Sequence, residues 1–184
     1  GVRAGADLST RFGSVGFAIF ETGTNPISPF GLPFDIDAPR QAVGRSRAVE
    51  GYLSIPLARG ETTVSVDGWY TRWLDDVTRI YTPVDMGRGA LTYHGLYIGG
   101  QFEPLARLEV VHRGSLLAPI GLDDTPVSVP AYNTLNFELR FRIIDVQAFL
   151  LWDNVLRVQT GLPVESLPPA QPRIVYGASW RFRN

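Results

Sequence analysis

The sequence contains no cysteine among its 184 residues. Disulfide bonds, thiolate metal sites and cysteine nucleophiles are therefore excluded. Lysine is also absent, because all 17 basic residues are arginine, and the formal net charge is −1. A chain with so little net charge has no electrostatic preference for nucleic acid or for an acidic partner, so we expect no nucleic-acid partner.

Long apolar runs are missing as well. No stretch reaches the roughly 18 consecutive apolar residues that a membrane-spanning helix needs. The first five residues, GVRAG, lack the apolar core of a signal peptide, so we expect a removed signal or a preceding segment. Helical periodicity is nearly absent along the whole chain, which argues against an α-helical fold.

What the sequence does have is alternation at period two, together with 14 prolines, 19 glycines and 11% aromatic residues. This composition and this period are typical of β-strands. We therefore expect an all-β fold with one domain over residues 1–184. The predicted strands cover residues 2–11, 14–23, 46–57, 62–74, 90–102, 106–115, 133–143, 146–157 and 173–182.

The connections between these strands alternate between short and long. Short turns are expected at residues 11–14, 58–61, 103–105 and 144–145. Long connections are expected at about residues 23–45, 75–89, 116–132 and 158–172. An outer-membrane β-barrel sorts its loops in this way, with short periplasmic turns and long extracellular loops. Strands of about ten residues also suit a tilted membrane crossing, so we expect an antiparallel transmembrane β-barrel.

Several strands are expected to have one apolar and one polar or charged face, as LNFELRFR shows from residue 135 onward. A soluble β-barrel or sandwich with polar outer faces would give the same alternation, so that alternative stays open. In a membrane barrel the apolar face meets lipid and the charged face meets the lumen. The expected lipid-facing residues are Leu135, Phe137, Leu139, Phe141, Tyr176, Trp180 and Phe182, and the expected lumen-facing residues are Glu50, Asp67, Glu138, Arg140, Arg142 and Arg181.

Aromatic residues are expected to form two belts at the ends of the strands, where aromatic rings favour the lipid headgroup level. We place Trp69, Trp73, Tyr93, Trp152 and Tyr176 toward the long connections, and Phe102, Phe141, Trp180 and Phe182 toward the short turns.

The number of predicted strands is odd, and nine strands cannot close a wholly antiparallel barrel. Either residues 2–11 are not a strand, which leaves a closed eight-stranded barrel, or further strands precede the chain. We favour the second alternative, in which this chain is the C-terminal segment of a larger barrel.

Three stretches carry a resemblance to a known family. They are YNTLNFELRFRIIDVQAFLLWDNVL with its WDNVL end at residues 152–156, PAQPRIVYGASWRFRN, and RAVEGYLSIPL followed by SVDGWYTRW. Together they resemble the C-terminal barrel strands of TonB-dependent receptors. The stretch WDNVL is similar to the aromatic-x-Asn-Leu element of that family. The final strand also resembles the outer-membrane recognition signal, although Arg183 and Asn184 follow Phe182.

The resemblance implies a barrel of about 22 strands around a plug in the bacterial outer membrane. It further implies uptake of a scarce ligand such as a metal chelate. The plug and the energy-coupling box of that family are N-terminal, and this sequence contains neither. The implied partners are outer-membrane lipid and an upstream plug or barrel segment, or another chain, that completes the barrel.

Few residues suggest other chemistry. His94 and His112 are the only histidines, and they lack the companions of a recognisable metal site. His112 and Ser115 are three apart and face opposite ways on a strand. Asp75-Asp76 and Asp123-Asp124 are best interpreted as solvated loop residues. We therefore expect no catalytic residue, metal or cofactor, and no enzyme activity. An eight-stranded anchor or binding barrel, or a lipid-modifying barrel enzyme, remains as an alternative.

Overall fold

The computed structural model describes residues 1–23, 45–74, 82–119, 126–158 and 172–180. Its described residues contain strands and turns only, and none of them forms a helix that could cross a membrane. The all-β prediction is therefore confirmed. The strands are β1 (Val2–Thr10), β2 (Gly13–Gly23), β3 (Arg45–Ala58), β4 (Thr62–Trp73), β5 (Asp85–Gly95), β6 (Phe102–Arg113), β7 (Leu116–Pro119), β8 (Pro126–Val129), β9 (Tyr132–Ile143), β10 (Val146–Asp153) and β11 (Arg173–Trp180).

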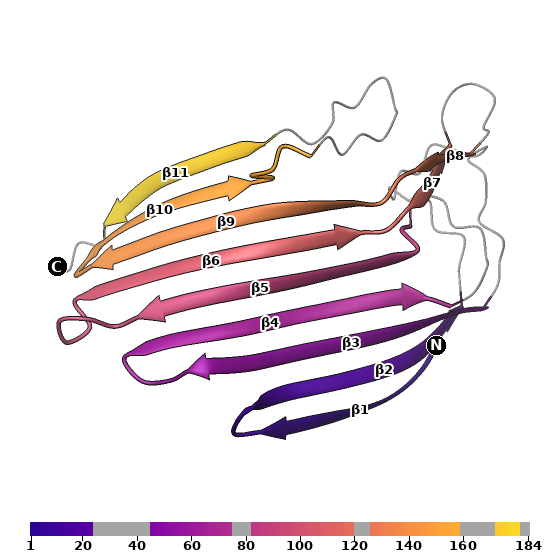
Figure 1. The fold of residues 1–184 in the computed structure, drawn as a ribbon, viewed down its shortest axis with the longest axis horizontal. Coiled ribbons are helices and arrows are strands. Elements are labelled where there is room, and N and C mark those ends of the chain that lie inside the picture. Colours follow the sequence, from indigo (N-terminus) through magenta and orange to yellow (C-terminus); the bar gives the residue numbers. More distant parts are fainter. Residues whose placement is uncertain (24–44, 75–81, 120–125, 159–171, 181–184) are drawn as a thin grey trace.

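Nine of these strands form one antiparallel sheet in the order β1-β2-β3-β4-β5-β6-β9-β10-β11 (Figure 1). Each strand of this sheet pairs with the one before it, except where the separate hairpin of β7 and β8 is inserted between β6 and β9. The short turns all lie at one end of the sheet, and the hairpin lies at the other. We call these the turn end and the long-connection end. The sheet is not closed, because β1 and β11 are its two edges.

The predicted turn at residues 103–105 is wrong. The chain turns at residues 96–101, where Ile98, Gly99 and Gly100 all have positive φ angles of 55°, 60° and 83°. Glycine adopts such angles without steric cost, so the Gly99-Gly100 pair sets the turn here. Consequently β5 covers Asp85–Gly95 rather than 90–102, and Tyr93 lies at the turn end rather than at the long-connection end.

Pro104 lies inside β6, although its ring removes a backbone donor. The pairing of β5 with β6 ends at His94 and Leu105, so Pro104 has no partner on β5. It faces Phe141 on β9. Proline is tolerated at this point because the ladder that would use its missing N–H ends one residue away.

Two further boundaries differ from the prediction. The hairpin of β7 and β8 lies inside a segment that we expected to be a loop, with Leu116 opposite Val129. The strand predicted at residues 146–157 ends at Asp153, because Asn154 has a φ of 52° and leaves the extended conformation. Asparagine tolerates this left-handed region better than most residues do.

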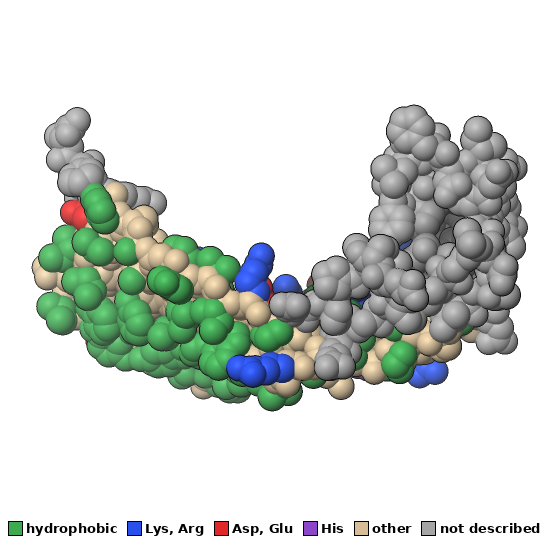
Figure 2. Space-filling model, turned by 90° about the horizontal axis from the view of Figure 1, so that it is seen from above, with side chains coloured by type: hydrophobic (Ala, Val, Ile, Leu, Met, Phe, Trp, Pro, Cys, Tyr) green, Lys and Arg blue, Asp and Glu red, His purple; other side chains and the backbone are tan. Residues whose placement is uncertain are grey.

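The register sorts the side chains onto two faces. Leu135, Phe137, Leu139 and Phe141 lie on one face, which β10 continues with Leu150 opposite Leu139 and β11 with Tyr176 opposite Leu150. Trp180 lies on the same face, opposite Val146. Figure 2 shows hydrophobic side chains covering the outwardly curved side of the sheet. We call this the convex face and the other the concave face.

The apolar side chains of the convex face have no second layer of described structure above them. Phe17, Trp180 and Tyr176 are 62%, 59% and 80% exposed. Few hydrophobic residues of the described chain are buried, and most of these are alanines. They are Ala18, Ala48, Ala90, Leu116 and Val129. The large apolar residues of the described sheet therefore do not form a packed core, and in water so large an apolar surface calls for a covering partner.

Candidate functional site

The concave face collects most of the charged side chains of the sheet. Asp67 lies opposite Ala90, which lies opposite Glu109, and Asn136 continues this row on β9. The residues that we expected to share a polar face, Glu50, Asp67, Glu138, Arg140 and Arg142, all lie on this concave face by their register. Arg181 and Phe182 lie outside the described residues.

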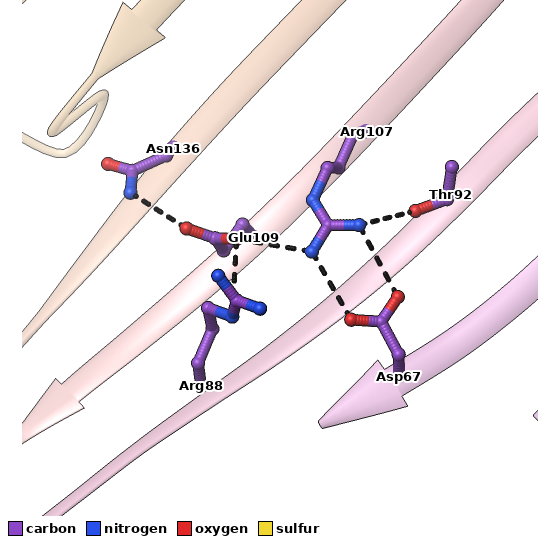
Figure 3. Close-up of polar contacts among 6 residues, drawn as sticks. All are labelled: Asp67, Arg88, Thr92, Arg107, Glu109 and Asn136. Carbon is purple, nitrogen blue, oxygen red and sulfur yellow. Dashed lines mark hydrogen bonds and ion pairs between the residues drawn. The ribbon is translucent and has the colours of Figure 1, made fainter. Parts of the chain in front are cut away.

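Arg107 lies at the centre of a hydrogen-bond network on this face (Figure 3). Its Nη1 donates to Asp67 Oδ1 at 3.3 Å and to Thr92 Oγ1 at 2.9 Å, and its Nη2 donates to Asp67 Oδ2 at 3.2 Å. Nη2 also donates to Glu109 Oε2 at 3.3 Å. A guanidinium that binds one carboxylate through both nitrogens is held in a fixed orientation. The side chains are about three-quarters buried, so solvent screens these bonds only partly.

The reach of Arg107 depends on a small residue between its partners. Asp67 is on β4 and Arg107 is on β6, so the guanidinium must cross β5. Ala90, which is 4% exposed, lies opposite both Asp67 and Glu109 and leaves room above the β5 backbone. The network therefore ties three adjacent strands together through side chains as well as through the backbone.

Glu109 extends the network toward β9 and β10. Arg88 Nε lies 3.7 Å from Glu109 Oε2, and Asn136 Nδ2 donates to Glu109 Oε1 at 3.4 Å. The Oδ1 atom of Asn136 accepts a hydrogen bond at 3.0 Å from the backbone N–H of Asn154. That N–H belongs to the residue directly after β10, so the row fixes the point where the chain leaves the sheet.

Asn154 is 4% exposed, and both the nitrogen and the oxygen of its side-chain amide form hydrogen bonds. Its Nδ2 donates to the Val158 carbonyl at 2.8 Å, and its Oδ1 accepts from the Val158 N–H at 3.0 Å. Asn154 is the central residue of the WDNVL stretch that carried the family resemblance. In this structure it holds a tight turn at the start of the segment that follows β10.

A second charged group lies at the turn end of the concave face. Glu103 accepts hydrogen bonds from Arg142, and its Oε1 lies 2.6 Å from His94 Nε2. Arg140 pairs with Glu138 two residues earlier on the same strand. The predicted residues Glu138, Arg140 and Arg142 are thus each neutralised by a near neighbour.

Ion pairs continue to both edges of the sheet. Arg3 Nη2 lies 2.7 Å from Glu50 Oε1, which joins β1 to β3 across β2. Arg173 Nη2 lies 2.9 Å from Asp153 Oδ2, which joins β11 to β10. Arg3 and Arg173 are much more exposed than Arg107, and exposed pairs contribute little to stability.

The concave face carries equal numbers of positive and negative strand residues among those described. The arginines are Arg3, Arg88, Arg107, Arg113, Arg140, Arg142 and Arg173, and the carboxylates are Asp7, Glu50, Asp67, Glu103, Glu109, Glu138 and Asp153. Such a face offers many donors and acceptors but no strong field of one sign. It suits contact with another polar surface better than selection of an ion by its charge.

The two histidines lie on opposite faces. His94 is on the concave face beside Glu103, whereas His112 is on the convex face, with Nδ1 2.7 Å from Asn133 Oδ1 and Nε2 3.4 Å from Asp85 Oδ2. The described residues contain no group of three or more potential metal ligands. Ser115 follows the end of β6, where its backbone carbonyl accepts from the Val84 N–H. Asp75-Asp76 and Asp123-Asp124 lie outside the described residues.

The aromatic belts need correction on the concave side. Trp69 lies opposite Tyr52 and Arg88, and Trp73 packs edge-on against Phe20 with ring centroids 5.7 Å apart, so both tryptophans are on the concave face. Trp152 lies on the convex face at the long-connection end, opposite Phe137 and Ile174. Phe102 stacks with Phe141 at the turn end.

The central residues of the network, Arg107 and Glu109, were not among the predicted lumen-facing residues. Their signal was present, because Arg107 and Glu109 alternate with the apolar Leu108 and Val110. What alternation cannot show is that Arg107 reaches across β5 to Asp67, which depends on the register and on the size of Ala90.

Comparison of this chain with models of protein families, with curated proteins and with solved structures finds no match in any of the three.

Proposed function

We propose that this chain forms part of the wall of a β-barrel in the bacterial outer membrane. The observation that carries the proposal is the contrast between the two faces of one sheet. Large apolar side chains such as Phe17, Tyr176 and Trp180 stand exposed on the convex face, whereas the charged residues of the concave face pair with one another. Hydrocarbon outside and a polar interior account for both faces together.

The dimensions of the convex face support this location. From Leu135 to Ile143 the face is apolar throughout. An extended strand covers about 27 Å over this stretch, or about 20 Å along the membrane normal at a tilt of about 40°. The apolar band of outer-membrane barrels is similar, at about 25 Å. The gathering of the short turns at one end of the sheet is the second supporting feature.

A larger barrel than the nine strands described here fits the edges of the sheet. The strands alternate in direction, so β1 and β11 run the same way. Closing one onto the other would need a parallel pair. The closed eight-stranded alternative requires that residues 2–11 lie outside the sheet, but Val2–Thr10 pairs along its whole length with β2. This pairing favours a wall segment over a complete small anchor barrel.

Within this proposal, the resemblance to TonB-dependent receptors suggests a receptor or transporter that takes up a scarce ligand such as a metal chelate. The neutral, hydrogen-bonding concave face would then line the lumen and contact a plug or a polar ligand. In the alternative of a lipid-modifying barrel enzyme, His112 would need a nucleophile, yet its two ring nitrogens face Asn133 and Asp85.

The test has two stages. Outer membranes of the source bacterium are separated on a density gradient, and the full-length polypeptide is examined by gel electrophoresis with and without heating. We expect it in the outer-membrane fraction with a migration that changes on heating. A full-length polypeptide that stays monomeric in solution without detergent would overturn the membrane proposal. A deletion strain that takes up metal chelates normally, despite correct location of the wild-type protein, would overturn the receptor proposal alone.

A further inference from the structure

One part of the concave face carries aromatic rings and hydroxyl groups in place of the ion-pair network. It lies over β1, β2, β3 and β4, which are consecutive neighbours in the sheet (Figure 1). By register, Tyr52 lies opposite Gly16 on one side and opposite Trp69 on the other. Asp7 lies opposite Gly16, so these four residues form one row across four strands. We call this row and the serines beside it the aromatic patch, and those serines are Ser14, Ser54 and Ser65.

Tyr52 presents one face of its ring to the space in front of the sheet. A Cβ atom at position 16 would lie 2.4 Å from Tyr52 Cε1 and 2.8 Å from its hydroxyl oxygen, so the ring lies over the Gly16 backbone. Tyr52 is nevertheless 39% exposed. The strand covers one face of the ring and leaves the other face open to a ligand.

The polar groups of the aromatic patch are also available. Within the described part of the chain, the Tyr52 hydroxyl and the Trp69 indole N–H have no hydrogen-bond partner, and neither do the hydroxyls of the three serines. In the neighbouring network, by contrast, Arg107 and Glu109 bind each other and the side chains around them (Figure 3). Unpaired donors and acceptors beside an open ring are the groups that orient a ligand in a binding site.

The aromatic patch lacks aliphatic side chains. Among the paired residues on the concave side of β1 to β4, the structure describes no valine, leucine, isoleucine or methionine. At the other edge of the sheet, Phe149 lies over Gly177 in the same way but has Leu151 and Val175 beside it. The centres of protein interfaces are apolar, so the aromatic patch is a poor match for a protein segment.

The charged residues next to the two rings favour a neutral ligand. All but Asp7 are in ion pairs, namely Glu50 with Arg3, Asp67 with Arg107, and Arg88 with Glu109. Asp7 has no cation partner in the described chain, and its carboxylate would repel an anionic ligand. The molecule that fits best is therefore uncharged, carries many hydroxyl groups and has a flat face of C–H groups.

We propose that the aromatic patch binds a neutral oligosaccharide, with one pyranose ring stacked on Tyr52 and a neighbouring one on Trp69. The C–H groups on one face of a pyranose are attracted by the negative face of an aromatic ring. The hydroxyls at the edge of the sugar then exchange hydrogen bonds with Asp7, Ser14 and Ser54. This inference rests on the barrel-wall part of the proposed function, which places the concave face in water, and it names a ligand class for that face.

The experiment uses the full-length protein in an uncharged detergent whose headgroup is not a sugar, so that the detergent does not compete. Binding is measured by isothermal titration calorimetry. The neutral probes are maltohexaose, cellohexaose, mannohexaose and xylohexaose, and hexagalacturonate is the acidic comparison. At least one neutral probe is expected to bind, and hexagalacturonate is expected to bind more weakly than that probe because of the Asp7 carboxylate.

The test variants Y52A and W69A each remove one ring. S54R instead places a long side chain in front of the patch without removing any packing. The matched control is F149A, which removes the ring that lies over a glycine at the other edge. Y52F keeps the ring and removes only the hydroxyl. Every variant is checked for heat-modifiable migration, so that a variant that does not fold is recognised.

Y52A and W69A should each weaken binding about tenfold, which corresponds to about 1.4 kcal/mol, because each loses one stacking contact. S54R should weaken it by a similar factor. F149A and Y52F should bind within about threefold of the wild type, which is less than about 0.7 kcal/mol.

Three results would each contradict the inference: no binding of any neutral probe, equally tight binding of hexagalacturonate, or a loss in F149A as large as that in Y52A. A fourth concerns a protein segment as the occupant. Slow reaction of a Y52C thiol with a charged maleimide in the folded, sugar-free protein shows that polypeptide covers the patch, and the saccharide site is then wrong.

Failure of the proposed function gives a different result. A protein that binds the oligosaccharide but is absent from the outer-membrane fraction contradicts the membrane location alone. A protein that is found in the outer membrane, migrates as a folded barrel and binds none of the neutral probes contradicts only this inference.

Discussion

Gly16 on β2 lies directly opposite Tyr52 on β3, and the tyrosine ring occupies the space above the glycine. A Cβ atom at position 16 would lie 2.4 Å from Cε1 of Tyr52, well inside van der Waals contact. The same arrangement recurs at the other edge of the sheet, where Gly177 lies opposite Phe149 and a Cβ would be 2.8 Å from the ring. In both places the missing side chain lets an aromatic ring lie flat against the neighbouring strand.

G16A is therefore expected to displace the Tyr52 ring and to lower the free energy of unfolding by about 1–2 kcal/mol. The same substitution in a Y52A background should cost almost nothing, because the ring is no longer there. G51A is the matched control, since the atom nearest to its Cβ would be 3.9 Å away, and it should change stability by less than about 0.5 kcal/mol. Urea titration of the protein folded in lipid vesicles measures all four variants. Equal losses in G16A and G51A would contradict the role given to Tyr52.

R107Q should destabilise the sheet by about 1–2 kcal/mol, because it leaves Asp67 and Glu109 partly buried without their common donor. We expect R107K to recover only part of the loss, since an ammonium cannot bind both oxygens of Asp67 at once. The comparison is R3Q, which removes the ion pair between Arg3 and Glu50. The Arg3 side chain is mostly exposed, so this pair should contribute less than about 1 kcal/mol to the free energy of unfolding. Unfolding midpoints at low salt give the values. A loss of stability in R3Q as large as that in R107Q would show that the Arg107 network stabilises the sheet no more than an exposed ion pair does.

The absence of cysteine allows the two faces to be tested one residue at a time. In F137C the thiol is expected on the lipid side, and in E138C it is expected on the aqueous side. A charged maleimide applied to the protein in lipid vesicles should label E138C rapidly and F137C very slowly, because the reagent does not enter hydrocarbon. Both thiols should react at similar rates after denaturation. Faster labelling of F137C in the folded protein would invert the assignment of the faces.

Depth along the convex face should determine the cost of an introduced charge. Leu139 lies midway between Leu135 and Ile143 on β9. L139R is expected to lower the free energy of unfolding by about 2–4 kcal/mol and I143R by only about 0–1 kcal/mol. The comparison is made by urea titration in vesicles of one lipid composition. In a water-soluble protein with this face exposed, both substitutions would be nearly neutral, so the difference between them tests the membrane location itself.

The alternation in the sequence was sufficient to predict the class of the fold and the composition of its faces. Leu135, Phe137 and Leu139 could be assigned to one face and Glu138 to the other because a strand has no other way to arrange them. The turn between β5 and β6 could not be placed correctly, because Pro104 has the stronger local signal for a turn. That signal was overridden by the Gly99-Gly100 pair and by the end of the β5 ladder next to Pro104.

The candidate site was less accessible to sequence analysis. The bond between Arg107 and Asp67 joins residues 40 positions apart, on strands that are not neighbours. Its formation depends on the register of three strands and on the small volume of Ala90. The partner of Glu103 could not be predicted either, since both His94 and Arg142 reach it only after the true turn brings β5 and β6 into line.

The two edge strands, β1 and β11, run in the same direction, and this affects how copies of the chain could associate. Two copies inserted the same way up in one bilayer would meet through strands that point the same way. Their contact would have to use the slanted hydrogen bonds of a parallel pair, which are slightly weaker per residue than the antiparallel bonds inside the sheet. The edges of β1 and β11 are therefore poorly suited to polymerising with copies of themselves, even though open edges of this length usually invite aggregation.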